Sequence, residues 1–146
     1  MKKKELKIIG WREWVSLPDF KIDEIKAKVD TGARTSSLHA FNLEIYKRGN
    51  SEFVSFSIHP NQRSSNNEIR CRSKILEFRK IKSSNGLSEI RPVILTKIKL
   101  LEEIFEIEMT LTNRDEMGFR MLIGRESIRN KFLINPSKSF YGNKIN

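Results

Sequence analysis

The stretch that decides how this chain folds is IKAKVDTG, residues 25–32. Its apolar side chains alternate with polar ones, and this period of two is typical of a half-buried strand. The strand ends at Asp30, and Gly32, which has no Cβ, allows a tight turn directly after it. A carboxylate that backbone N–H groups hold in such a loop is suited to activating a water molecule. The stretch therefore predicts a candidate hydrolytic half-site.

A second stretch late in the chain, MLIGR at residues 121–125, is a short apolar strand that ends at a glycine. We expect a strand from Arg120 to Ile123, followed by one short helix from Arg125 to Lys131. An acidic residue near the start of this helix and basic residues near its end suit the helix dipole. The candidate half-site therefore depends on two stretches in a fixed order, a strand that ends in Asp-Thr-Gly early in the chain and an apolar strand that ends in Gly-Arg late in it.

Composition bounds the class of protein. The 146 residues are 38% hydrophobic and 32% charged, which is typical of a soluble globular protein, and the length predicts one domain spanning residues 1–146. No apolar run is long enough to span a bilayer and no signal-peptide pattern follows Met1, so we expect a cytoplasmic protein without membrane contact. Cys71 is the only cysteine, which agrees with a reducing compartment.

The formal net charge of +10 favours anionic partners and salt-dependent binding. Nucleic acid, an acidic peptide and a ribosomal surface are all compatible with this charge. The sequence has no zinc-finger, RNA-recognition or helix-turn-helix pattern, so direct nucleic-acid binding is not expected. A solvated basic face without a partner would also explain a charge excess of this kind.

Two hairpins are expected between the two motif stretches. The first spans residues 43–58 and turns at Arg48-Gly49-Asn50. The second spans residues 69–100, turns at residues 83–86, and is long enough to project from the body of the protein. The apolar phase of its first arm slips near Ile75, which a β-bulge would explain.

A further strand, from Ile104 to Leu111, alternates cleanly and is expected to pair with the strand that ends at Leu100. Its expected core face consists of Phe105, Ile107, Met109 and Leu111, whereas Glu106 and Glu108 point outward. Helix signals are scarce along the whole chain. The elements therefore add up to an all-β, barrel-like domain.

The chain resembles the retropepsin-like aspartic peptidases that are sometimes labelled ATP-dependent zinc proteases and are associated with ATP-grasp ligases that add glutamates. The resemblance covers most of the chain and rests on the segments at residues 9–13, 27–36, 38–40, 110–115 and 119–125. It implies a closed all-β, retropepsin-like (acid protease) barrel with one short C-terminal helix. The second hairpin would be the flap over the substrate, and the first would be an addition to the minimal retropepsin plan.

The resemblance also implies a mechanism. Two aspartates share one proton, because two carboxylates so close together cannot both ionise. This chain has one Asp-Thr-Gly, so the second aspartate must come from a second copy in a homodimer. The implied catalytic residues are Asp30, Thr31 and Gly32. The implied substrate-binding residues are Ala33, Arg34, His39, Gly86 and Arg125.

The substrate expectation follows from the cationic residues near the motif. Arg34, His39 and Arg125 would make the cleft cationic and would attract carboxylates. The hypothesis is an aspartic endopeptidase that hydrolyses peptide, isopeptide or amide bonds of an anionic, Glu-rich protein tail. Implied partners are an acidic substrate and an ATP-grasp ligase or a ribosomal protein.

Alternatives remain open at each of these positions. Asp30 can be a turn-forming residue without catalytic activity. Arg34 can form a structural ion pair with Asp30 or Glu13. A noncatalytic basic adaptor or regulator of a ligase or ribosomal protein would carry the same charge. Replacing Asp30 separates a peptidase from an adaptor.

No metal and no cofactor are expected. The borderline metal ligands His39, His59 and Cys71 lie on separate expected elements, and no paired spacing is typical of zinc. A zinc site would need the fold to bring these residues together with Asp30. No phosphate loop is present either, so any use of ATP belongs to a partner.

Overall fold

The computed structural model describes residues 5–60, 68–82, 85–113 and 118–142. Strands dominate these ranges, as the alternating patterns predict. They are β1 (Lys7–Gly10), β2 (Arg12–Leu17), β3 (Ile22–Asp30), β4 (Ser36–His39), β5 (Phe41–Arg48), β6 (Ser51–Ile58), β7 (Ile69–Lys74), β8 (Glu77–Lys82), β9 (Ser88–Leu100), β10 (Glu103–Thr112), β11 (Met121–Gly124) and β12 (Phe132–Asn135). One 3-10 turn (Pro18–Phe20) and one helix, α1 (Arg125–Ile128), complete the described elements.

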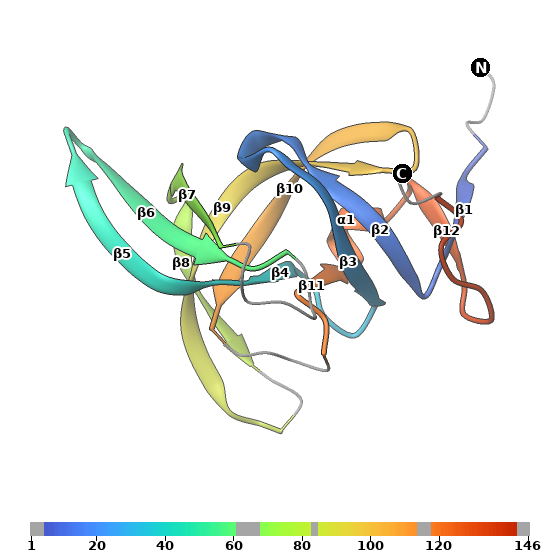
Figure 1. Ribbon diagram of the computed structural model, residues 1–146. Coiled ribbons are helices and arrows are strands. Elements are labelled where there is room, and N and C mark those ends of the chain that lie inside the picture. Colours follow the sequence, from blue (N-terminus) through green and yellow to red (C-terminus); the bar gives the residue numbers. More distant parts are fainter. Residues whose placement is uncertain (1–4, 61–67, 83–84, 114–117, 143–146) are drawn as a thin grey trace, which may run out of the picture.

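Six strands close into a barrel (Figure 1). Their order is β10-β4-β11-β3-β2-β9, and β9 pairs with β10 to complete the ring. The expected all-β closed barrel with one short helix near the C-terminal end is confirmed. The core inside the ring is aliphatic and consists of the inward residues of these strands, among them Val15, Leu17, Ile25, Ala27, Leu38, Ile94, Ile98, Leu100, Met109, Leu111, Met121 and Ile123.

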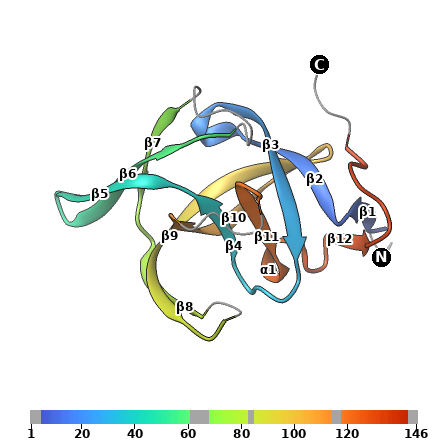
Figure 2. The same cartoon turned by 60° about the horizontal axis from the view of Figure 1, so that its bottom comes forward.

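The two motif stretches meet in this barrel. β11 lies between β3, to which it is parallel, and β4, to which it is antiparallel. The register places Gly124 opposite Asp30 at the ends of β11 and β3. In Figure 2 the long arrow of β3 ends near β11 and α1. Two segments almost a hundred residues apart in sequence therefore form one loop-bearing edge.

The predicted strand 104–111 is confirmed as part of β10, and its partner is β9. Ile107, Met109 and Leu111 are buried, Phe105 is half-buried, and Glu106 and Glu108 are exposed, as the alternation predicts. The helix prediction is only partly right. The helix has a single turn that ends at Ile128, because the chain then turns and enters β12, which the sequence reasoning missed.

The first predicted hairpin is confirmed as β5–β6, with Gly49 in the left-handed turn conformation (φ 64°). The second prediction is wrong in its first arm. Residues 69–74 form β7, which pairs with β6, so β5, β6 and β7 make a separate three-stranded sheet. Of the predicted second hairpin, only β8 and β9 pair with each other, and their hairpin extends downward in Figure 1, whereas β5–β6 extends to the left. Residues 83–84 of the predicted tip lie outside the described residues.

The apolar phase slip near Ile75 has a different cause from the predicted bulge. β7 pairs with β6 as far as Lys74, and β8 pairs with β9 from Glu77 onward. Ile75 donates its N–H to Glu52, and the next residue, Leu76, donates to Val93 on the barrel. The chain therefore changes sheets here, and Leu76 and Phe78, the apolar residues that produce the slip in the sequence, are exposed and do not face a core.

The N-terminal part of the chain forms two strands, which are divided at Trp11. β1 lies beside the C-terminal strand β12, to which it is parallel, and β2 pairs with β3 and β9 in the barrel. The N-terminal and C-terminal segments are therefore neighbours (Figure 1). Among the described residues, no helix is long and apolar enough to cross a membrane.

Candidate active site

The Asp-Thr-Gly loop is a tight turn at the end of β3. Asp30 is half-buried, and its Oδ1 accepts a hydrogen bond from the Gly32 N–H at 3.1 Å. The Ala33 N–H donates to the Asp30 carbonyl oxygen at 3.2 Å and closes the turn. Thr31 and Gly32 are exposed. The loop thus holds one carboxylate at the edge of the barrel and leaves Thr31 at the surface.

The end of strand β11 packs against the residues that follow this loop, because the backbone of Gly124 lies close to that of Thr35 and Ser36. The Gly124 N–H donates to Ser36 Oγ at 2.9 Å, and Ser36 Oγ lies 2.6 Å from Ser127 Oγ on α1. A Cβ on Gly124 would stand 2.5 Å from the carbonyl carbon of Thr35, so no larger residue fits without a backbone shift. The glycine of the late motif is therefore needed for packing. Sequence reasoning missed both serines.

Arg125 and the start of α1 hold the outer side of the loop. The Arg125 guanidinium donates from Nη1 to the Thr31 carbonyl oxygen at 2.9 Å. The backbone N–H of Arg125 donates to the Ala33 carbonyl oxygen at 2.8 Å. The Glu126 N–H donates to the Arg34 carbonyl oxygen at 3.0 Å. The structure therefore brings Arg125 to the predicted site, where it contacts the loop backbone.

Arg34 is exposed and lies beside a cavity of about 270 Å³. The cavity is lined by Arg34, Thr35, Phe105, Glu106, Ile107, Glu108, Glu126, Ser127 and Lys131. Three carboxylates and two cations thus share this cavity, so its charge is mixed. The structure records no ion pair of Arg34 with Asp30 or Glu13 among the described residues, which removes that alternative.

Glu13 has a different role, which sequence reasoning missed. Its side chain is fully buried and accepts three backbone hydrogen bonds. Oε2 accepts from Gly10 at 2.7 Å and from Tyr141 at 2.9 Å, and Oε1 accepts from Gly142 at 3.0 Å. The signal was present in the sequence, because Glu13 stands in phase with the core residues Val15 and Leu17. The carboxylate fixes the C-terminal segment to the start of β2.

His39 lies at the end of β4 and contacts Arg120 instead of the Asp-Thr-Gly loop. Its Nδ1 lies 3.1 Å from Arg120 Nη1, and its Nε2 lies 3.2 Å from the Asn113 carbonyl oxygen. A guanidinium can only donate, so Nδ1 is the acceptor and the ring proton sits on Nε2. His39 therefore contacts Arg120 and the Asn113 backbone in this arrangement.

The projecting hairpin is tied to the site loop at its base. Arg79 on β8 donates to Glu77 at 2.6 Å, to Glu108 on β10 at 2.8 Å, and to Thr35 at 3.3 Å. Hydrogen bonds to Glu77 and then Glu108 raise the pKa of Arg79 above its ordinary value. Gly86 lies at the far end of this hairpin in the left-handed conformation (φ 86°). The base is anchored by Arg79, whereas Gly86 does not touch the loop.

The structure gives no metal site to the three residues weighed as metal ligands, His39, His59 and Cys71. Within the part of the chain that the structure describes, no three His, Cys, Asp or Glu side chains come together in a way that could hold a metal ion. His59 stacks on Phe41, with 4.5 Å between ring centroids. Cys71 is buried, and burial raises the pKa of its thiol to about 11, although Arg70 acts in the opposite direction.

A closed barrel with one Asp-Thr-Gly loop, held against a late hydrophobic-Gly-Arg strand, defines the acid-protease class of fold. The family model described as "RimB-like: Retropepsin-like aspartic endopeptidase RimB" matches residues 8–144. The chain belongs to this family.

Curated relatives carry a different kind of name. The chain is 53% identical over 133 residues to a "Probable alpha-L-glutamate ligase" of Shewanella pealeana, covering 91% of this chain and 29% of that protein. It is 47% identical over 131 residues to a protein of the same name from Desulfotalea psychrophila, covering 90% of this chain and 28% of that one. The chain thus spans less than a third of the length of these relatives.

A solved structure shares the fold. It is the protein Lpg0085, of unknown function (DUF785), from Legionella pneumophila subsp. pneumophila strain Philadelphia 1. The two chains are 25% identical and superpose with a TM-score of 0.76 over 94% of this chain and 98% of the other.

Proposed function

We propose that this chain is an aspartic endopeptidase that acts as a homodimer on an anionic, Glu-rich protein tail. The observation that carries the proposal is the position of Asp30, whose carboxylate ends a barrel strand in a tight Asp-Thr-Gly loop. Only Oδ1 has a recorded donor among the described residues, namely the Gly32 N–H. The other oxygen is therefore available to a water molecule or to a second carboxylate.

The chemistry needs two carboxylates. One Asp30 in its ionised form removes a proton from water, and the protonated Asp30 of a second copy donates its proton to the carbonyl oxygen of the bond that breaks. The two groups keep different protonation states because like charges at short distance cannot both ionise. No other Asp-Thr-Gly exists in the sequence, so a single chain carries half a site.

A two-fold dimer supplies the missing half. Thr31 and Gly32 are exposed at the end of β3, where a second loop can approach. In such a dimer the hydroxyl of Thr31 would donate to the backbone of the opposite loop, and Gly32 would permit the close approach. Arg125 would stabilise each loop from behind through its bond to the Thr31 carbonyl oxygen.

The anionic substrate is supported by charge and by the relatives. The chain has a net charge of +10, and Arg34 is exposed one residue beyond Ala33 in the site loop. Curated relatives are named glutamate ligases, and their matched segment is less than a third of their length. A peptidase domain that acts on a glutamate tail would be chemically related to a ligase that makes one.

The same names favour a second candidate, a noncatalytic adaptor that binds a ligase. Such an adaptor would use its basic surface and would not need the carboxylate of Asp30. The two candidates therefore differ in how they respond to one substitution.

The test is mass-spectrometric cleavage of peptides with Glu-rich tails, from acidic to neutral pH, with wild type beside Asp30→Asn. Asp23→Asn is the matched control, because Asp23 is an exposed aspartate at the opposite end of the same strand. We expect wild type and Asp23→Asn to cleave and Asp30→Asn to lose at least 100-fold in kcat/KM, while sedimentation shows a dimer. Absence of cleavage by a dimeric wild type would favour the adaptor.

A further inference from the structure

The outer face of β2 and β3 carries a row of cations that leads to Asp30. Along β3, Lys26, Lys28 and Asp30 alternate with the buried Ile25 and Ala27 and with Val29, so the three polar side chains share the outer face. On β2, which is antiparallel to β3, Arg12 pairs with Lys28 and Trp14 pairs with Lys26. We call Arg12, Lys26 and Lys28 the cationic ladder.

Aromatic rings hold two cations of the ladder. The Arg12 guanidinium lies 4.6 Å from the ring centroid of Trp11 and 4.9 Å from that of Phe140. The Lys26 ammonium lies 5.8 Å from the ring of Trp14 and 5.7 Å from that of Phe119. The rings are themselves in contact, Trp14 with Phe140 and Trp11 with Phe119. Such contacts orient a cation without neutralising its charge.

Other arginines of the protein are used differently. Arg79 and Arg91 each form an ion pair with a neighbouring glutamate, and the side chain of Arg91 is almost fully buried. Among the described residues, the structure records no carboxylate within ion-pair distance of Arg12 or Lys26. These two positive charges are therefore available to an anion that comes from outside.

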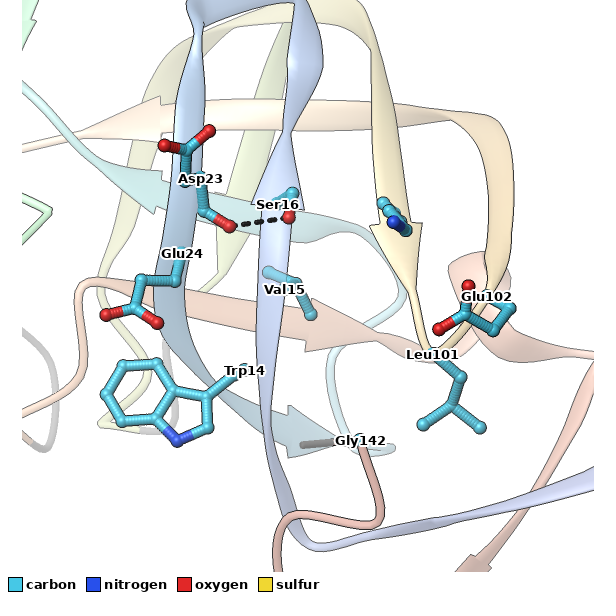
Figure 3. Close-up of a pocket in the computed structure, with 9 residues that line it drawn as sticks. Trp14, Val15, Ser16, Asp23, Glu24, Leu101, Glu102 and Gly142 are labelled. Carbon is cyan, nitrogen blue, oxygen red and sulfur yellow. Dashed lines mark hydrogen bonds between the residues drawn. The ribbon is translucent and has the colours of Figure 1, made fainter. Parts of the chain in front are cut away.

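The ladder has a defined end. Glu24 is the next residue on the same face of β3, beyond Lys26. It lines a pocket whose other charged residues are Asp23, Glu102 and Lys99, so carboxylates outnumber cations there by three to one. Figure 3 shows the Glu24 carboxylate beside the ring of Trp14, on the side away from Leu101. An acidic ligand would be repelled there, so the attractive stretch runs from Lys26 to Asp30.

We propose that the cationic ladder is a binding site for the carboxylates of an extended acidic peptide, and that it leads the peptide to Asp30. Side chains on one face of a strand repeat every two residues, at roughly 6.6–6.8 Å, in the protein and in an extended peptide alike. Glutamates at alternate peptide positions therefore match Lys26 at one position and Arg12, which lies opposite Lys28, at the next. The inference rests on the proposed function, because it assigns the acidic substrate to this face.

Binding is measured apart from cleavage. Fluorescence anisotropy with Asp30→Asn protein compares two labelled peptides of equal charge, Glu-Ser-Glu-Ser-Glu-Ser and Glu-Glu-Ser-Ser-Ser-Glu. Only the first has glutamates two residues apart. We expect it to bind more tightly, and we expect Lys26→Gln and Lys28→Gln each to weaken its binding by about two- to five-fold, as for exposed ion pairs. Lys26→Arg should restore binding.

The controls are Lys47→Gln and Lys74→Gln, which remove the same charge from exposed positions on the separate β5–β6–β7 sheet. Equal weakening by these controls, or equal affinity for the two peptides, would overturn the ladder. The two measurements distinguish a failure of the ladder from a failure of the peptidase proposal. If the ladder variants weaken binding but wild type cleaves nothing, the ladder is supported and the peptidase proposal is refuted. If wild type cleaves the peptide and neither ladder variant changes kcat/KM, the peptidase proposal is supported and the ladder is refuted.

Discussion

Replacing Glu13 by Gln tests whether the buried carboxylate fixes the C-terminal segment to the barrel. The two carboxylate oxygens accept three backbone N–H bonds, from Gly10, Tyr141 and Gly142. A Gln amide offers one oxygen. In its better orientation that oxygen keeps the bonds from Gly10 and Tyr141, while the NH₂ group faces the N–H of Gly142, so two donors oppose each other in a fully buried site.

The magnitude follows from the number of bonds changed. Hydrogen bonds to a charged acceptor contribute about 1.5–3 kcal/mol and neutral ones about 0.5–1.5, and an unsatisfied buried donor costs about 1–3 kcal/mol. The neutral amide costs less to bury than a charge, which offsets part of this loss. We therefore expect Glu13→Gln to lower the free energy of unfolding by about 2–4 kcal/mol. Because 1 kcal/mol corresponds to ~4 °C in a domain of this size, Tm should fall by about 8–16 °C.

Thermal unfolding followed by circular dichroism gives Tm, and hydrogen exchange locates the effect. The amides of Tyr141 and Gly142 should exchange faster in Glu13→Gln, whereas the amides of β9 and β10 should keep their order of protection. Glu44→Gln is the control, because Glu44 is 78% exposed and its nearest cation, on Arg70, lies 3.7 Å away. A Tm for Glu13→Gln equal to that of Glu44→Gln would refute the reasoning.

Two further predictions concern the projecting β8–β9 hairpin and the cysteine. Arg79→Met removes the hydrogen bonds to Glu108 and Thr35. The amides of β8 should therefore exchange faster with solvent, and KM for a cleaved peptide should rise by about two- to ten-fold. Lys80→Met, on the opposite face of β8, should change neither the exchange rates nor KM. Cys71 should react with a thiol reagent at pH 8 about 100-fold more slowly in the folded protein than in urea. At this pH a thiol with a pKa of about 11 has a thiolate fraction about two orders of magnitude smaller than a thiol with the ordinary pKa of 9.0. Equal rates in the two states would contradict the assigned burial.

The fold was predictable where side chains alternate cleanly. β3, β6 and β10 each have a period of two that shows on the sequence, and the barrel class follows from many such strands with scarce helix signals. The failure at Ile75 has a physical reason. Leu76 and Phe78 are apolar but exposed, so the shift in the apolar pattern does not mark a shift in which side chains face a core, and the change from one sheet to the other could not be read from it.

The candidate site was predictable at the loop and less so around it. Both motifs of the candidate site could be found in the sequence, and the structure brings the Asp-Thr-Gly turn and Gly124 together because the two motifs end strands that pair in register. His39 was expected to bind substrate, and its hydrogen bonds to Arg120 and Asn113 could not be read from spacing, since the partners lie 74 or more residues away. Its role as a binding residue stays a prediction.

The cations behind the net charge of +10 fall into two groups, which the structure distinguishes by their neighbours. Some cations are internal supports: Arg79 joins β8 to β10, and Arg91 is buried against Glu89. Others, such as Lys26 and Arg12, lie on aromatic rings with no recorded carboxylate among the described residues. Internal pairs contribute nothing to attraction at a distance, so salt dependence should arise from the second group. A basic protein is therefore selective for an acidic partner where cations without a carboxylate neighbour are spaced regularly along one face.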